Sequence, residues 1–107
     1  MLFADAVGST EFAHGRDPEV VFGRIRAAVA VMVDATQRHG GFVCQFRGDG
    51  IMALFGAPVA TEQAPSQAVL AALEMQARLG SEERSDRLQF RIGVHTVRSW
   101  LAPLRRR

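Results

Sequence analysis

The sequence predicts an α+β fold in which a four-stranded antiparallel sheet carries its helices on one face. Apolar segments typical of strands are interleaved with two segments of helical periodicity. Their order is strand, helix, strand, strand, helix, strand, which is the βαββαβ order of the ferredoxin-like arrangement. The chain of 107 residues, with 48% apolar and 22% charged residues, suits one small globular domain.

The first strand and the first helix are predicted from local signals. Residues 2–5 form an apolar run that indicates the end of a strand, and residues 7–10 indicate a tight loop. The tripeptide at 17–19, Asp-Pro-Glu, predicts a helix start with a capping acid and a proline in the first turn. Helical spacing continues through Val21, Ile25, Ala28, Met32 and Ala35. The dipeptide Gly40-Gly41 after His39 is expected to end this helix.

A β-hairpin is predicted in the middle of the chain. Residues 42–47 alternate like a strand, with Phe42, Cys44 and Phe46 on one face and Val43, Gln45 and Arg47 on the other. Residues 51–55 form a second short apolar run. The dipeptide Asp49-Gly50 between the two favours a turn, because both residues tolerate a positive φ.

The last part of the chain predicts a second helix and a final strand. The helix runs from about Pro65 to Leu79, ends at Gly80, and carries Val69, Ala72, Leu73 and Gln76 on one face. A polar linker over residues 81–87 follows. In the final strand, Leu88, Phe90, Ile92 and Val94 alternate with Gln89, Arg91, Gly93 and His95.

Charge and composition narrow the classes of function. All thirteen basic residues are arginines, so no lysine chemistry is available. The net charge of +2 is close to zero without the terminal segment 105–107, so a nucleic-acid partner is not expected. Cys44 is the only cysteine, which rules out an internal disulfide and suits a reducing compartment such as the cytoplasm. No apolar run approaches the roughly 20 residues of a membrane span, and no signal-peptide pattern is found.

Two acidic residues are predicted to meet at one end of the sheet. The first and third strands lie side by side in the expected arrangement, so Asp5 and Asp49 fall at the same end, with few cations predicted beside them. Close carboxylates repel unless a proton or a metal lies between them, and oxygen ligands favour Mg²⁺. The glycines Gly8, Gly48 and Gly50 would let the backbone approach a bulky anion, and the N–H groups of residues 7–10 would hold phosphate.

Each of these residues also has a plainer interpretation. Asp-Gly is a common turn dipeptide, so Asp49 can be structural, and Asp5 can cap the helix that follows. The tripeptide 47–49, Arg-Gly-Asp, spells an adhesion motif, although nothing indicates secretion. The three histidines, His14, His39 and His95, are scattered without the spacing of metal ligands.

Three motifs decide between these interpretations. "LFADAVGST" at 2–10, "GDGIMALFGAP" at 48–58 and "RIGVHT" at 91–96 resemble the catalytic domain of class III nucleotidyl cyclases, the adenylate and guanylate cyclases. Their order and spacing fit, as do "RHGG" before the hairpin and "AVLAALEMQ" after it. The resemblance covers residues 1–96, which we interpret as a partial cyclase domain, and leaves residues 97–107 as an unmatched arginine-rich tail.

The resemblance implies a two-metal site for Mg²⁺ or Mn²⁺. In this resemblance, Asp5 and Asp49 match the family's two metal-binding aspartates, and the backbone carbonyl of Ala6 matches a third metal contact. The family's triphosphate loop is matched by Val7, Gly8, Ser9 and Thr10. The family reaction is attack of the ribose 3′-oxygen of ATP on the α-phosphate, which releases pyrophosphate and makes cyclic AMP for intracellular signalling. Family sites form between two protomers, so a homodimer, or a heterodimer with another cyclase domain, is implied.

Two features depart from the family pattern. Gln45 stands at the base-reading position where many members carry lysine, and an amide both donates and accepts hydrogen bonds, so GTP stays open beside ATP. Beyond Thr96 the sequence does not match the family segment with the second base-reading acid and the transition-state Asn and Arg. We therefore expect a truncated domain that holds the metal half of the site and is inactive alone. A non-catalytic module that pairs with another cyclase, and a degenerate gene remnant, are the alternatives.

Overall fold

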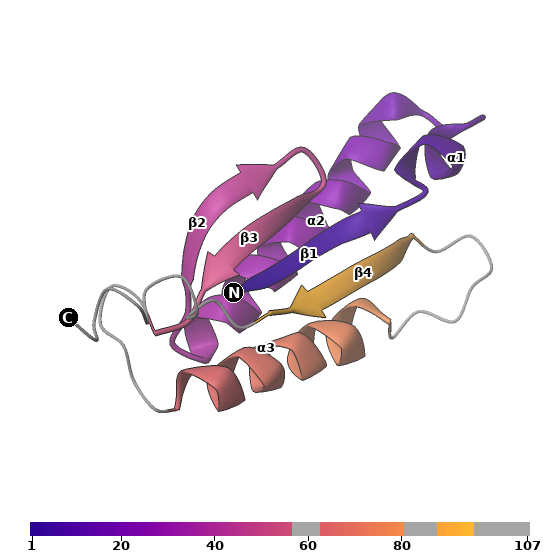
Figure 1. Cartoon of the computed structure of the whole chain (residues 1–107). Coiled ribbons are helices and arrows are strands. Elements are labelled where there is room, and N and C mark those ends of the chain that lie inside the picture. The colour runs from indigo at the N-terminus through magenta and orange to yellow at the C-terminus, as the bar shows by residue number, and fades with distance from the viewer. Residues whose placement is uncertain (57–62, 81–87, 96–107) are drawn as a thin grey trace.

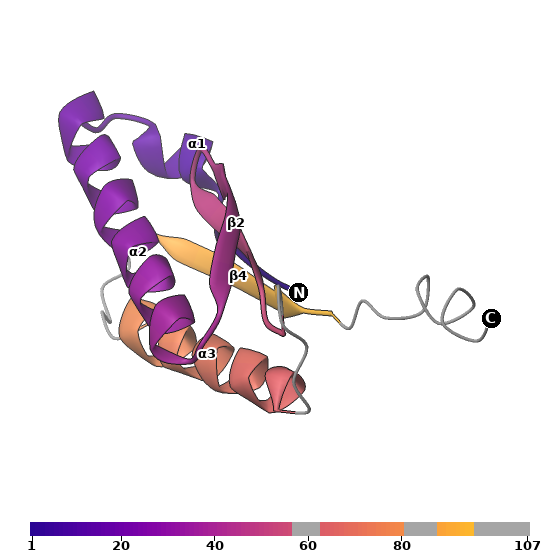
Figure 2. The same cartoon turned by 90° about the vertical axis from the view of Figure 1, so that its left-hand side faces the viewer.

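The computed structural model describes residues 1–56, 63–80 and 88–95. Its elements are β1 (Leu2–Val7), α1 (Ser9–Ala13), α2 (Pro18–Arg38), β2 (Phe42–Arg47), β3 (Gly50–Leu54), α3 (Ala64–Leu79) and β4 (Gln89–Val94). The strands form one antiparallel sheet in the order β2-β3-β1-β4. Helices α2 and α3 lie on one side of this sheet (Figure 1 and Figure 2). The predicted α+β, ferredoxin-like fold is confirmed, while the linker at 81–87 and the tail at 97–107 lie outside the described residues.

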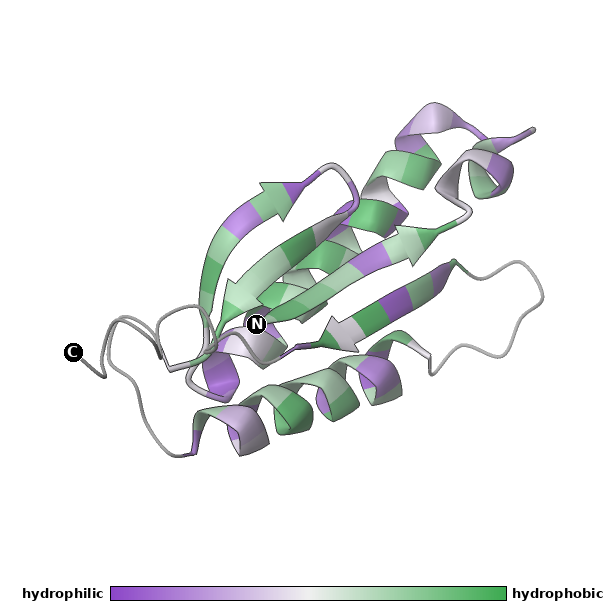
Figure 3. Cartoon of the chain, viewed as in Figure 1, coloured by the Kyte–Doolittle hydropathy of each residue, from purple (hydrophilic) through white to green (hydrophobic). Residues whose placement is uncertain are grey.

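The core fills the space between the sheet and the two long helices. It consists of Leu2, Ala4, Ala28, Met32, Ala35, Ile51, Ala53, Ala71 and Met75. Alternate residues of β1 face the helices, because successive side chains of a strand point to opposite faces. Figure 3 shows β1 and β3, the two central strands, as mostly hydrophobic. Within the described ranges, none of the helices combines the length and the apolar character needed to cross a bilayer.

Helix α2 begins and packs as its sequence predicts. Asp17 is the N-cap, and its Oδ1 accepts a hydrogen bond from the Glu19 N–H at 2.9 Å. The buried residues of the predicted face are Val21, Ala28, Met32 and Ala35. Ile25, the remaining member of that face, is only partly buried and lines a groove of about 480 Å³ between α2 and β2.

Helix α3 buries a different face from the predicted one. The prediction that groups Val69, Ala72, Leu73 and Gln76 on one face is wrong for Val69 and Leu73, which are 48% and 55% exposed, whereas Ala72 packs against the core. The buried residues are Ala64, Ala68, Ala71 and Met75. Alanine ends at Cβ, so this face lets the helix backbone approach the sheet closely.

A β-bulge in β2 changes which side chains share a face. The register shifts at Cys44, which is the extra residue of the bulged strand. As a result Phe46 pairs with the buried Ile51 and faces the helices, whereas Phe42 lies on the opposite, open face of the sheet. The predicted common face of Phe42, Cys44 and Phe46 is therefore wrong, because simple alternation assumes a strand without a bulge.

The hairpin turn lies one residue earlier than predicted. Arg47 pairs with Gly50, so Gly48 and Asp49 form the turn and Gly50 belongs to β3. Neither Asp49 nor Gly50 has a positive φ. Gly50 is needed for close packing instead, because a Cβ there would overlap the backbone oxygen of Ala4.

Candidate active site

The structure brings Asp5 and Asp49 together at one end of the two central strands. Asp5 pairs with Gly50, the residue that follows Asp49, in the antiparallel ladder between β1 and β3. The Ala6 N–H donates to the Asp49 backbone oxygen at 3.1 Å. The prediction that the two acidic residues lie near the same end of the sheet is thus confirmed.

The Asp5 carboxylate has an oxygen that is free to accept a hydrogen bond or to bind a cation. Its Oδ1 is buried and has no hydrogen-bond partner within the described part of the chain. The Nε of Arg91 lies 3.5 Å from this oxygen, which makes an ion pair but is too long for a good hydrogen bond. A buried carboxylate oxygen without a donor is costly, so this atom is suited to bind a cation or a further donor.

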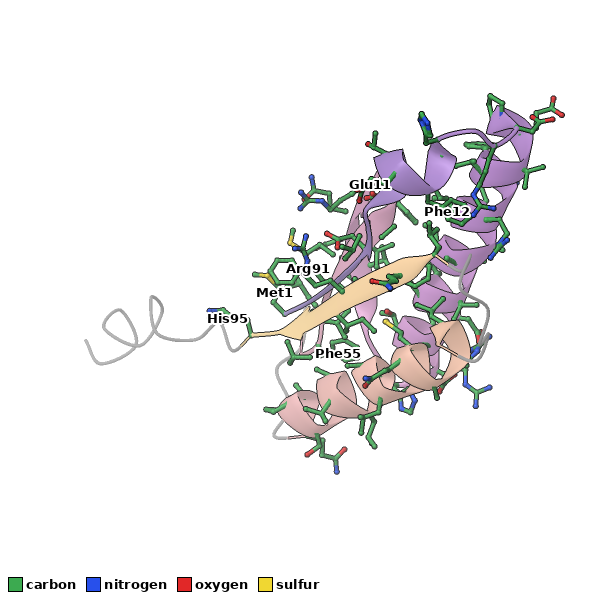
Figure 4. All side chains as sticks on the ribbon, turned by 90° about the vertical axis from the view of Figure 1, so that its right-hand side faces the viewer. Met1, Glu11, Phe12, Phe55, Arg91 and His95 are labelled. Atoms are coloured by element: carbon green, nitrogen blue, oxygen red, sulfur yellow. The ribbon has the colours of Figure 1, made fainter. Side chains whose placement is uncertain are left out.

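Arg91 is a site residue that the sequence analysis missed. It lies opposite Asp5 in the ladder between β1 and β4, and its side chain is 73% exposed. Figure 4 shows it on the side of β4 that faces away from α2. The prediction of few cations beside the acids did not identify this one, because only the β1–β4 register reveals the neighbour, and a register between strands distant in sequence is not a local signal.

The predicted triphosphate loop contains the start of a helix. Strand β1 continues to Val7, Gly8 turns the chain with a φ of +69°, and α1 begins at Ser9, where a loop was predicted through Thr10. The Ser9 hydroxyl donates to Oδ2 of Asp49 at 3.4 Å, which is a long hydrogen bond. The loop and the hairpin tip therefore meet directly, although they are 40 residues apart in sequence.

The donor set at this end of the sheet fits a hard divalent cation. It consists of two carboxylates with the backbone of Ala6 between them, all oxygen ligands of the kind that Mg²⁺ and Mn²⁺ prefer. Across residues 1–56, 63–80 and 88–95, no group of three or more His, Cys, Asp or Glu side chains could hold a metal ion. A cation here would therefore need further oxygens from water or from substrate phosphates, as Mg²⁺ commonly does.

Gln45 lies away from the acidic pair. It pairs with Met52 across β2 and β3, and Met52 in turn pairs with Phe3 of β1. The side chain is exposed on the open face, and strand β3 separates it from β1. Within one chain Gln45 is thus on the same face as Asp5, at a different part of the sheet.

Residues 1–99 match the family model described as the adenylate and guanylate cyclase catalytic domain. The chain belongs to this family. Adenylate cyclase 1 of Rhizobium meliloti (strain 1021) is 31% identical to this cyclase domain over 101 residues. That match covers 89% of the present chain and 15% of the relative, so the chain spans a small part of the length of such relatives.

Solved cyclase structures share the fold. The guanylyl cyclase Cya2 is 30% identical with a TM-score of 0.68, and the match covers 86% of this chain and 50% of Cya2. The guanylate cyclase domain of RhGC from Catenaria anguillulae, solved in complex with GTP, has a TM-score of 0.74 at 18% identity, with 86% and 52% of the two chains covered. The present cyclase domain therefore spans about half the length of these solved chains.

Proposed function

We propose that this chain carries the metal- and triphosphate-binding half of a nucleotide cyclase active site, with ATP as the substrate and cyclic AMP and pyrophosphate as products. The pairing of Asp5 with Gly50 supports this most strongly, because it holds the two carboxylates at the same end of adjacent strands. GTP is the second nucleotide consistent with an amide at Gln45. Since ATP is an intracellular substrate, the proposal includes a cytoplasmic location.

The residues of this chain would bind and orient the nucleotide. Asp5, Asp49 and the backbone carbonyl of Ala6 supply oxygen ligands for Mg²⁺ or Mn²⁺, and the N–H groups of residues 7–10 face the triphosphate. Two bound metals would lower the pKa of the ribose 3′-hydroxyl and stabilise the leaving phosphates. Arg91 offsets the charge of Asp5 before a cation binds, and its exposed side chain is able to move away afterwards.

A second cyclase domain would complete the site. The open face of the sheet exposes large apolar side chains, with Phe3, Val7 and Phe42 at 39%, 41% and 54% exposure. Such a surface favours association with another protein face, here a second copy of this chain or another cyclase domain. The same surface supports a second candidate function, in which the chain binds another cyclase without contributing to catalysis.

Calorimetric titration of Mn²⁺ with ATP tests the metal site. The parent chain should bind, and Asp5→Asn and Asp49→Asn should each weaken binding by about tenfold or more, because each removes one charged ligand. Gly23→Ala is the matched control, since Gly23 lies within α2 and a Cβ there meets no atom within 4 Å. Equal binding by the parent and by both Asn variants would refute the two-carboxylate site.

Turnover tests the division of the site between two chains. The 107 residues alone should form no measurable cyclic nucleotide, because none of them matches the family's transition-state Asn and Arg. Loss of one preorganised donor typically costs about 10²–10³ in rate. Mixing with an intact cyclase whose own metal aspartates are changed to alanine should restore cyclic AMP or cyclic GMP formation with Mn²⁺. Cyclic nucleotide formed by the chain alone would contradict this division of the site. Absence of product from the mixture, despite metal binding by the chain, would favour the gene-remnant alternative.

A further inference from the structure

Helix α1 links the proposed metal site to helix α2. Its first residue, Ser9, donates to Oδ2 of Asp49 at 3.4 Å. One turn later, the half-buried Phe12 ring is bracketed by two arginines: the guanidinium carbon of Arg16 lies 4.2 Å from the ring centroid, and that of Arg24, on α2, lies 5.4 Å from it. Figure 4 shows Phe12 between α1 and the N-terminal part of α2.

We infer that α1 is a positioning strut for Asp49, in which Phe12 anchors the helix to α2 and the Ser9 hydroxyl orients the carboxylate. The inference rests on the proposed function only in treating Asp49 as a metal ligand. A five-residue helix has little stability of its own, so an external anchor is needed to fix its position. Two guanidinium groups over one ring provide that anchor, because a cation is attracted to the face of an aromatic ring.

Further contacts make the strut rigid at both ends. The Arg16 Nε donates to the Phe12 backbone oxygen at 2.7 Å, which fixes the guanidinium over the ring. The Phe12 N–H donates to the Gly8 oxygen at 2.9 Å, which ties the anchor to the turn before Ser9. The position of the Ser9 hydroxyl thus depends on Phe12, and the side chains of Ser9 and Phe12 act by positioning Asp49 rather than as metal ligands.

Four variants and a control separate this role from general stability. Ser9→Ala removes the hydroxyl, and Ser9→Thr retains one. Phe12→Leu removes the ring, and Phe12→Tyr retains it. The control is Phe22→Leu, because Phe22 also lies under an arginine, with the Arg26 guanidinium carbon 5.5 Å from its centroid, but belongs to α2 and not to α1. Thermal midpoints of all variants establish that each is folded.

Metal affinity and metal-free spectra are both measured. Ser9→Ala and Phe12→Leu should weaken Mn²⁺–ATP binding by about tenfold, the lower end for loss of a residue that orients a ligand, while Ser9→Thr, Phe12→Tyr and Phe22→Leu bind like the parent. Without metal, the amide NMR signals of Gly48, Asp49 and Gly50 should shift in Ser9→Ala and Phe12→Leu but not in Ser9→Thr and Phe12→Tyr. Phe22 lines the same groove as Gly48, so Phe22→Leu is a control for metal affinity alone.

The outcomes distinguish the strut from the proposed function. Unchanged Gly48–Gly50 signals in both Ser9→Ala and Phe12→Leu would overturn the strut, whatever the metal affinity. Failure of the parent to bind Mn²⁺–ATP would refute the proposed function, while the metal-free spectra would still decide the inference. If Phe12→Leu does not fold, Ser9→Ala, which deletes a single hydroxyl, carries the test with Ser9→Thr as its control.

Discussion

Replacing Gly50 by alanine should lower the free energy of unfolding of the domain far more than replacing Gly48 by alanine. A Cβ at Gly50 would overlap the backbone oxygen of Ala4 and lie 2.6 Å from the Cα and Cβ of Asp5. These atoms belong to the central strand of the sheet and cannot rotate away. Strands β1 and β3 would therefore have to separate next to the proposed metal site.

The size of the effect follows from the atoms displaced. Forcing an extra carbon into a packed core typically costs about 1–3 kcal/mol. The Ala6–Asp49 backbone hydrogen bond and its neighbour in the ladder contribute about 0.5–1.5 kcal/mol each and would be weakened. We expect a loss of about 2–4 kcal/mol, which is a large part of the stability of a small domain.

Urea unfolding followed by circular dichroism measures this difference. Gly48→Ala is the control, since no atom lies within 4 Å of its added Cβ, and it should stay within about 0.5 kcal/mol of the parent. Mn²⁺–ATP binding by the folded fraction should be weakened in Gly50→Ala. Equal unfolding midpoints for the two variants would show that β1 and β3 do not approach as closely as described.

Two further predictions concern the helices. Gly23 lies within α2, has no positive φ, and has no atom within 4 Å of an added Cβ, so Gly23→Ala should raise the free energy of unfolding by about 0.5–1 kcal/mol in urea titrations. The pKa of Glu74 is lowered, first by the His39 hydrogen bond and then by that of Arg78. A carboxyl group whose pKa is lowered on folding stabilises the fold at pH values above its usual pKa of 4.5, and this contribution is lost as the pH falls further. The parent should therefore lose thermal stability more steeply than Glu74→Gln below pH 4.5. Parallel melting curves for the two proteins from pH 6 to pH 3 would contradict this.

Local sequence signals were sufficient for the order of the four strands and the two long helices, and for the meeting of the two acids, but they missed the short helix α1. Asp17 and Pro18 start α2 through contacts within one turn, and a hairpin joins strands that are adjacent in sequence. Once the strand order is known, Asp5 and Asp49 must lie at the same end of the sheet. These are consequences of periodicity, capping and connection rules, which act over a few residues.

Features that depend on contacts distant in sequence could not be predicted in the same way. The buried face of α3 is chosen by how closely Ala68 and Ala71 let it approach the sheet, although the hydrophobicity of Leu73 favours another face. The bulge at Cys44 adds a residue that no alternation pattern reveals. Arg91 reaches Asp5 only through the register of β1 with β4.

Strand β1 joins the stability of the domain to its proposed chemistry. Ala4 and Ala6 point into the core and Asp5, between them, points to the open face, so burial of the neighbours fixes the backbone of the carboxylate. The hairpin that carries Asp49 is fixed to the same strand by the ladder. Two carboxylates carried close together on paired backbones repel when both are charged, and Arg91 offsets part of this repulsion from an exposed position. A divalent cation bound as proposed would offset this repulsion, so the proposal couples metal binding to the stability of the same ladder.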